Sequence, residues 1–388
     1  MKAPVHILPI IVLAQFAGTS LWFAGNAVLA DLTILLGLDA NALGLITSAV
    51  QFGFISGTLV FAILTIADRF SPSLVFLLSS ILGGLFNAAI LFGEPTFTSL
   101  LTFRFLTGFF LAGIYPVGMK IAADWHEKGL GKALGFLVGA LVVGTAFPHL
   151  LKSLTANVTW EYVMIMSSAI AVIGGLTIYF FVPNGPLRKK GRGMEMGAFI
   201  SVFRKKEFRA AAFGYFGHMW ELYSFWAFVP FILMGYNEAN NTSLNVPTYS
   251  FAIIAVGALS CTLGGYLAFH YGSAKVAFFS LLLSGICCLM SPLLITISTP
   301  AFLLFLFIWG MTVISDSPQF STLVASNVET EIKGTALTIV KSIGFAITII
   351  SIQLISYFAD SIELVFLFLP LAAGPLFGLI SMRSLLIK

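Results

Sequence analysis

The chain has 388 residues, of which 59% are hydrophobic and only 9% are charged, and its mean hydropathy is +1.00. Soluble domains carry roughly 25% charged residues, so this composition excludes a soluble globular protein and indicates a membrane protein. The net charge of +4 does not indicate a nucleic-acid partner, because the basic residues collect in short loops between apolar segments.

Twelve apolar stretches follow one another along the chain, and each is long enough to cross a hydrocarbon core of about 30 Å at 1.5 Å per residue. A cleaved signal peptide is the alternative for the first stretch, because Ala27-Val28-Leu29-Ala30 is similar to a small-residue cleavage site. The length of that stretch and the eleven that follow it favour a membrane span. We therefore expect an all-α membrane protein with twelve transmembrane helices. The spans are 7–29, 41–66, 73–92, 97–122, 132–152, 161–183, 208–236, 247–269, 274–297, 300–325, 334–357 and 362–384.

Basic residues occupy alternate loops, and the densest group lies between the sixth and seventh spans, in residues 184–209. The intervening loops are mainly acidic, with Lys152 as their one basic member. By the positive-inside rule both termini and the linker 184–207 are cytoplasmic. A contact of this basic group with lipid headgroups is a further, unspecific possibility. The pattern predicts a multi-pass protein of the bacterial inner membrane.

The linker 184–207 divides the chain into two groups of six spans, residues 1–183 and 208–388, that repeat each other. "FRFLTGFFLAGIYPVG" in the fourth span aligns with "FLFIWGMTVISDSPQF" in the tenth, which pairs Pro116 with Pro318. We expect two pseudo-symmetric six-helix bundles. Many secondary transporters are duplicated in this way and bind their substrate between the halves, near the bilayer midplane.

The fourth span carries the pattern Leu101-x-x-Arg104-x-x-Thr107-Gly108-x-x-x-Ala112, which is similar to the arginine motif of the major facilitator superfamily in that helix. Together with the duplication, it makes the chain resemble a member of this superfamily over essentially its full length. The resemblance implies a secondary active transporter that works by alternating access.

The loop after the second span keeps Asp68 and Arg69 of the family's Gly-x-x-x-Asp-Arg-x-Gly pattern, with Leu64 and Ser71 at the glycine positions. The resemblance implies that Asp68 and Arg69 take part in gating. The glycine-proline motif typical of the family's antiporters is not present in the fifth span, which favours uptake over efflux.

Two segments, "GIYPVGMKIAADW" and "DSPQFSTLVA", are most similar to a bacterial group labelled nitrate/nitrite-transporter-like. Nitrate porters of this fold bind their anion with arginines on the second and eighth spans, which this chain lacks. Lys341 lies in the eleventh span, where the similar oxalate/formate exchangers use a lysine to attract an anionic substrate. The arginine that those exchangers have on the eighth span is also absent, so the resemblance leaves the substrate open.

Ionisable residues inside a membrane are functional candidates because a charge there costs about 2.5–3.5 kcal/mol. We expect Glu221 and Asp316 to carry coupling protons, because apolar surroundings favour the protonated form of a carboxyl group and so suit reversible protonation. Arg104 and Lys341 are expected to bind an acidic substrate. The alternatives are a protonated Glu221 hydrogen-bonded to a neighbouring helix, a permanent ion pair between Asp316 and Lys341, and an Arg104 that ties helices together.

Polar and aromatic side chains complete the predicted pocket. Gln15, Trp22 and Asn26 recur at helical spacing on the first span, and Tyr115 shares a face of the fourth span with Arg104. Helix packing is the alternative for any single aromatic residue. Pro116 and Pro318 predict kinks that let spans four and ten bend during gating. Two further candidates for substrate binding lie next to Glu221, namely His218 and Trp220.

The function we expect is proton-coupled uptake of a small polar or anionic organic solute by a monomeric transporter. The partners are thus a small-molecule substrate, protons and the lipid bilayer, with no cofactor and no metal. The alternatives are efflux of amphipathic compounds by proton antiport, a non-transporting membrane receptor or scaffold, and a channel. An enzyme is excluded because the chain contains no phosphate loop, zinc motif or nucleophile elbow, and its three cysteines have no metal or disulfide spacing.

Overall fold

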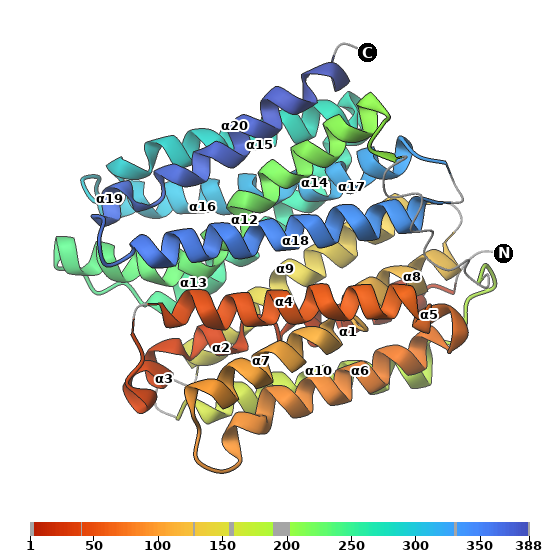
Figure 1. Ribbon diagram of the computed structural model, residues 1–388, viewed down its shortest axis with the longest axis horizontal. Helices are drawn as coiled ribbons and strands as arrows, with labels where there is room; N and C mark the ends of the chain where they lie inside the picture. Colours follow the sequence, from red (N-terminus) through yellow and green to blue (C-terminus); the bar gives the residue numbers. More distant parts are fainter. Residues whose placement is uncertain are drawn as a thin grey trace. The chain divides into compact units, whose positions relative to one another are not determined.

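A computed structural model describes residues 4–39, 41–126, 129–154, 159–188, 202–329 and 332–386, and the described chain is helical without strands. The chain forms two compact units, residues 1–194 and 195–388. Each unit is built from helices that lie alongside one another (Figure 1). Within the predicted linker, residues 189–201 lie outside the described part of the chain, and so does Lys128.

Ten helical segments in the described part of the chain are long and apolar enough to cross a membrane. They correspond to ten of the twelve predicted spans. The other two predicted spans contain α1, Ile7–Thr19, which is short, and α12, Lys206–Asn240, which has 35 residues. The many glycine, aromatic and polar residues of α12 give it a low mean hydropathy in spite of its length. The ten segments are Ala42–Ile63, Pro72–Leu91, Phe97–Trp125, Leu130–Leu154, Glu161–Phe181, Val246–Tyr271, Ser273–Leu293, Thr299–Ser326, Lys333–Phe358 and Leu364–Leu385.

Unit 1 contains two interrupted spans. The first span stops being helical after α1 and resumes at α2, so residues 20–23 form turns. The fourth span is split between α7 and α8, and Pro116 stands at the start of α8, where a proline needs no backbone hydrogen bond. The helices of this unit are α1 Ile7–Thr19, α2 Ala24–Ala27, α3 Leu29–Leu36, α4 Ala42–Ile63, α5 Ile66–Arg69, α6 Pro72–Ala88, α7 Phe97–Leu111, α8 Tyr115–Trp125, α9 Leu130–Leu154 and α10 Glu161–Phe181.

Unit 2 is arranged around the long helix α12, which packs against α17, α18 and α20. The tenth predicted span is split between α16 and α17 at Asp316, and Pro318 stands at the start of α17. Both prolines therefore lie just after a break in a span. The helices of this unit are α12 Lys206–Asn240, α13 Val246–Ala255, α14 Gly257–Tyr271, α15 Ser273–Met290, α16 Thr299–Ser315, α17 Ser317–Ser326, α18 Lys333–Phe358, α19 Leu364–Leu367 and α20 Ala373–Met382.

Two glycines bring helix backbones into direct contact at equivalent places in the two units. A Cβ on Gly108 of α7 would lie 2.0 Å from the carbonyl oxygen of Val50 on α4, and a Cβ on Gly310 of α16 would lie 2.1 Å from that of Ile253 on α13. Only glycine allows such an approach. Both glycines belong to the sequence repeat, so each unit packs its fourth helical span against its second in the same way.

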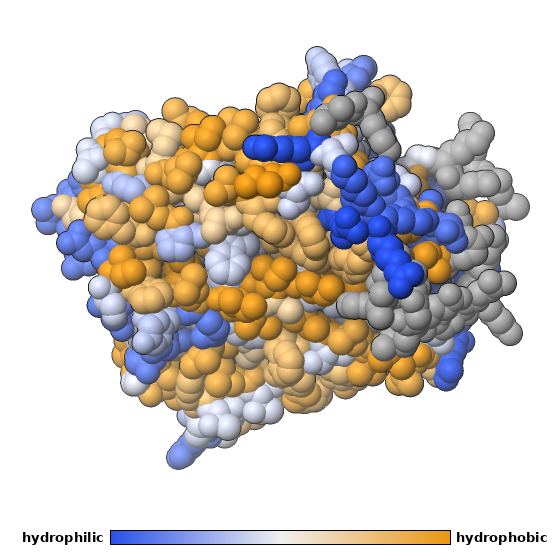
Figure 2. Space-filling view, turned by 45° about the horizontal axis from the view of Figure 1, so that its top comes forward, coloured by the Kyte–Doolittle hydropathy of each residue, from blue (hydrophilic) through white to orange (hydrophobic). Residues whose placement is uncertain are grey.

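Apolar side chains cover most of the face displayed in Figure 2. On α14, Leu259, Leu263 and Leu267 are 64%, 55% and 44% exposed and recur every four residues along one stripe. A soluble protein rarely exposes so much contiguous apolar surface. The exposed stripe therefore suits a helix that faces lipid, in a multi-pass membrane protein.

Candidate functional site

Arg104 lies on α7 and is only 1% exposed. Its Nη1 donates a hydrogen bond to Asn87 Oδ1 at 2.8 Å, and its Nη2 donates to the backbone oxygens of Leu21, at 3.0 Å, and Trp22. These two carbonyls belong to the break between α1 and α2, where helical hydrogen bonds stop. The guanidinium group thus caps the interrupted first span.

Asn87 of α6 connects this cap to another helix. Its Nδ2 donates to the backbone oxygen of Met164, at 3.2 Å, and to Ser168 Oγ, at 3.0 Å, both on α10. The sequence analysis offered two roles for Arg104, substrate binding and tying helices together. The hydrogen bonds in the structure are with protein groups on two neighbouring segments, α6 and the break between α1 and α2.

The other polar residues predicted on the first span lie around the same break. The ring of Trp22 is 4.8 Å from that of Phe54 on α4, and Asn26 Nδ2 donates to Thr47 Oγ1 at 2.7 Å. Gln51 lies between Thr47 and Phe54 on this face of α4, at helical spacings i, i+4 and i+7. Sequence reasoning missed Gln51, and its only signal was an amide in an apolar span.

Gln15 and Gln51 share an unusual property. Both side chains are 0% exposed, and neither amide nitrogen nor amide oxygen has a hydrogen-bond partner among the described residues. Gln15 lies against α8, because a Cβ on Gly118 would come 2.0 Å from its Oε1. Tyr115, one turn earlier on α8, is buried as well. We define Gln51, Asn26 and Arg104 as the unit 1 cluster.

Unit 2 holds the two buried carboxylates that the sequence singled out. Glu221 of α12 is 1% exposed and accepts a hydrogen bond from Trp309 Nε1 at 2.6 Å and another from Ser284 Oγ at 2.9 Å. Trp309 lies on α16 and Ser284 on α15. Glu221 therefore joins three helices, and sequence reasoning identified neither donor.

Asp316 has a partner that the sequence analysis did not foresee. His218 Nδ1 lies 2.8 Å from Asp316 Oδ1, and the two side chains are 1% and 0% exposed. Asp316 stands at the N-cap position of α17, where the helix dipole favours negative charge. His218 lies one turn before Glu221 on α12, and an ion pair between Asp316 and Lys341 stays a prediction. Lys341 lies half-buried on α18.

The remaining predicted residues are dispersed. Trp220 Nε1 donates to the backbone oxygen of Pro370 at 3.1 Å, a contact that packs α12 against the segment before α20. Asp68 forms an ion pair with Lys120 of α8 at 2.7 Å, and Arg69 Nε donates to Thr65 Oγ1 at 3.1 Å. Both residues of the predicted gate thus contact their own unit.

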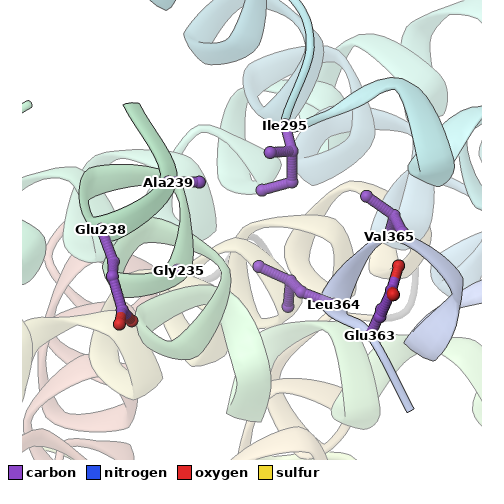
Figure 3. Close-up of a pocket in the computed structure, with 7 residues that line it drawn as sticks. All are labelled: Gly235, Glu238, Ala239, Ile295, Glu363, Leu364 and Val365. Carbon is purple, nitrogen blue, oxygen red and sulfur yellow. The ribbon is translucent and has the colours of Figure 1, made fainter. Parts of the chain in front are cut away.

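An open pocket of about 360 Å³ lies at one end of unit 2, between Gly235, Ile295 and Leu364. Figure 3 shows its aliphatic side chains pointing toward one another, while Glu238 points away from them. None of the predicted site residues lines this pocket. No group of three His, Cys, Asp or Glu residues suited to a metal ion occurs among the residues that the structure describes.

The chain can now be compared with known proteins. The family described as "Major Facilitator Superfamily" matches residues 10–352. The structure is similar to that of a mutant of the nucleoside transporter NupG, with a TM-score of 0.74, 14% sequence identity and coverage of 98% of this chain and 100% of the other. It is also similar to a bacterial homolog of the human lysosomal transporter Spinster in an inward-facing, unoccupied conformation, with a TM-score of 0.71, 15% identity and coverage of 98% and 96%. No curated protein matches the chain in sequence.

Proposed function

The chain belongs to the major facilitator superfamily, and on this premise we propose that it takes up a small polar or anionic organic solute, driven by a proton gradient. It is a transporter and not an enzyme. The proposal includes twelve membrane spans in two six-helix halves, alternating access, and both termini on the cytoplasmic side of a bacterial inner membrane.

The observation that carries the proposal is the pair of buried acidic groups in unit 2. Glu221 and Asp316 have almost no exposed surface, and a buried charge is tolerated only with close hydrogen-bond partners. Each carboxyl group contacts a side chain on another helix, namely Trp309 and Ser284 for Glu221 and His218 for Asp316. Gain or loss of a proton changes the strength of these contacts, so it can change how the helices pack.

The His218–Asp316 contact is placed where such a change would have an effect. It joins α12 to the break between α16 and α17, just before Pro318. A proton added to Asp316 replaces a charged acceptor by a neutral one and weakens its contact with His218. A span that is already broken can bend there at little cost.

The solved relatives, at 14–15% identity, support the fold alone, and the transport class rests on the family match. NupG is described as a nucleoside transporter. A nucleoside is one example of the small polar solutes within this proposal. Lys341, on α18, remains the proposed group for an acidic solute.

Uptake into proteoliposomes tests the proposal. A panel of small metabolites is offered with and without an inward proton gradient, and the gradient is expected to drive accumulation of at least one of them. Glu221→Gln and Asp316→Asn should abolish accumulation while solute exchange continues, because the neutral amide imitates the protonated carboxyl group.

The matched controls carry the same chemical changes at exposed positions of unit 2. Glu238→Gln on α12 and Asp360→Asn, after α18, should transport as the unmodified protein does. Accumulation by Glu221→Gln and Asp316→Asn at the unmodified rate would remove both carboxylates from the coupling step. Transport that ignores the proton gradient would reject proton coupling itself.

A further inference from the structure

Three of the five guanidinium hydrogens of Arg104, including both on Nη2, are committed to protein acceptors. Nη2 donates to both Leu21 and Trp22, and Nη1 donates to Asn87. A guanidinium group binds a carboxylate through two parallel N–H groups, either Nη1 with Nη2 or Nε with Nη2. Both arrangements need a free hydrogen on Nη2. An anionic solute would therefore have to break the cap of the first span before it could be held in this way.

The remaining nitrogen of Arg104 is covered by backbone. A Cβ added to Gly25 of α2 would lie 3.1 Å from Nε and 3.4 Å from Ile46 Cγ2. Nε has no hydrogen-bond partner among the described residues, but the α2 backbone lies across it. The charge in the unit 1 cluster thus serves the fold of the unit, and it is poorly placed to bind an acid.

Unlike Arg104, the two glutamines have side chains whose polar atoms lack partners. Four polar atoms of Gln15 and Gln51 are buried without a partner among the described residues. Each such group costs about 1–3 kcal/mol, and folded proteins leave few of them. A carboxamide offers two N–H donors and one carbonyl acceptor without charge, which matches the hydroxyl and amide groups of a neutral solute.

The surroundings of these amides suit such a solute. Gln51 shares its face of α4 with Phe54, whose ring is 4.8 Å from that of Trp22. Gln15 lies on α1, seven residues before Trp22, and touches the backbone of α8 at Gly118. Aromatic faces combined with a few polar groups are typical of small-molecule sites.

We propose that Gln15 and Gln51 bind an uncharged, hydrogen-bonding group of the transported solute, which makes the substrate a neutral polar molecule and not an anion. This inference rests on the proposed transport function, narrows its substrate class, and excludes the role proposed above for Lys341 as the partner of an acidic solute. Arg104 then acts as a positioning residue, which holds the break of the first span next to these amides.

Matched pairs of solutes that differ only in charge test the substrate class. The probes are nicotinamide with nicotinate, D-gluconamide with D-gluconate, and lactamide with lactate. The full chain in lipid nanodiscs is heated with each probe, and at least one neutral member should raise Tm in a saturable way, while its acidic counterpart should not. Stabilisation by the acidic members, or by none of the neutral members, overturns the proposal.

Variants then test the two glutamines. Gln15→Met and Gln51→Met keep the length of the side chain and remove its polar atoms, so each should weaken binding of the stabilising neutral probe at least tenfold. Thr107→Val is the control, because Thr107 is equally buried on α7 but donates its hydrogen bond to Phe103 within its own helix. Unchanged affinity in both methionine variants refutes the assignment of the amides.

A measurement without any solute gives independent information. If the amides are held in readiness for a ligand, removal of unpaired polar atoms should leave the Tm of the empty protein unchanged or higher. A lower Tm in both Gln15→Met and Gln51→Met would show that the amides stabilise the fold, and would overturn the proposal.

Proton-driven uptake of nicotinate or lactate, without binding of any neutral probe, would contradict this inference alone. Uptake of a stabilising neutral probe that does not respond to the proton gradient would contradict proton coupling alone.

Discussion

Replacement of Arg104 by methionine is expected to impair folding of unit 1 before it affects transport. Methionine fills part of the space of the arginine stem but removes every donor. Asn87 Oδ1 and the backbone oxygens of Leu21 and Trp22 then lose the hydrogen bonds that they accept from Arg104. These acceptors cannot reach water, because the site is buried.

The magnitude follows from the number of orphaned groups. Each buried acceptor left without a donor costs about 1–3 kcal/mol, so three of them cost ~3–9 kcal/mol together. A typical domain has a free energy of unfolding of about 5–15 kcal/mol. Arg104→Met should therefore lower Tm by several degrees or prevent recovery of folded protein. The Tm of Arg104→Lys should lie between those of the unmodified protein and Arg104→Met, because an ammonium group has three donors but a shorter reach.

Folded yield after detergent extraction and the Tm of the purified protein measure this effect. Thr107→Val, one turn further along α7, is the control and should leave both quantities near those of the unmodified chain. A stable, well-folded Arg104→Met protein would refute the role of Arg104 as a cap of the first span.

Three further predictions concern other contacts. Trp309→Phe keeps the aromatic ring but removes the hydrogen-bond donor that favours the ionised form of Glu221. The pH profile of gradient-driven uptake should therefore move to higher pH. An unchanged profile would exclude this donor from coupling. Lys120→Met removes the partner of Asp68 from a pair that is about one-quarter exposed on each side, so Tm should change by little, since exposed pairs contribute about 0–1 kcal/mol. Uptake should nevertheless slow if this pair belongs to the gate, and an unaltered rate would remove it. Gly310→Ala places a Cβ 2.1 Å from a backbone oxygen of α13 and should sharply reduce folded yield, whereas Gly265→Ala, which meets no atom within 4 Å, should not.

The membrane spans were largely predictable because their signal is local. Ten stretches of apolar residues became helices long enough to span a bilayer, and the breaks of the fourth and tenth spans were marked by Pro116 and Pro318. The break at residues 20–23 carries no proline or glycine. It is stabilised by a hydrogen bond donor from α7, so no pattern within the first span could reveal it.

The partners of the buried carboxylates were not predictable either, because they too lie on other helices. Glu221 meets Trp309 and Ser284, which are 88 and 63 residues away in sequence. A similar depth in the membrane allowed a pair between Asp316 and Lys341, but depth does not determine which face a side chain occupies and gave no sign of His218. The contact with His218 depends on how α12 packs against α17, which is a property of the folded unit.

The buried ionisable residues differ in whether they can lose their charge, and this difference suits them to different roles. A guanidinium group keeps its charge at every physiological pH, so a buried arginine needs permanent acceptors, and the structure supplies three to Arg104 from the protein itself. A carboxyl group can become neutral, so Glu221 and Asp316 tolerate burial in either state with fewer partners. If a transport cycle is to be driven by protons, the groups that change charge must be those whose surroundings allow both states. We therefore expect loss of Arg104 to be seen first in folding, and loss of either carboxylate to be seen first in the response to a proton gradient.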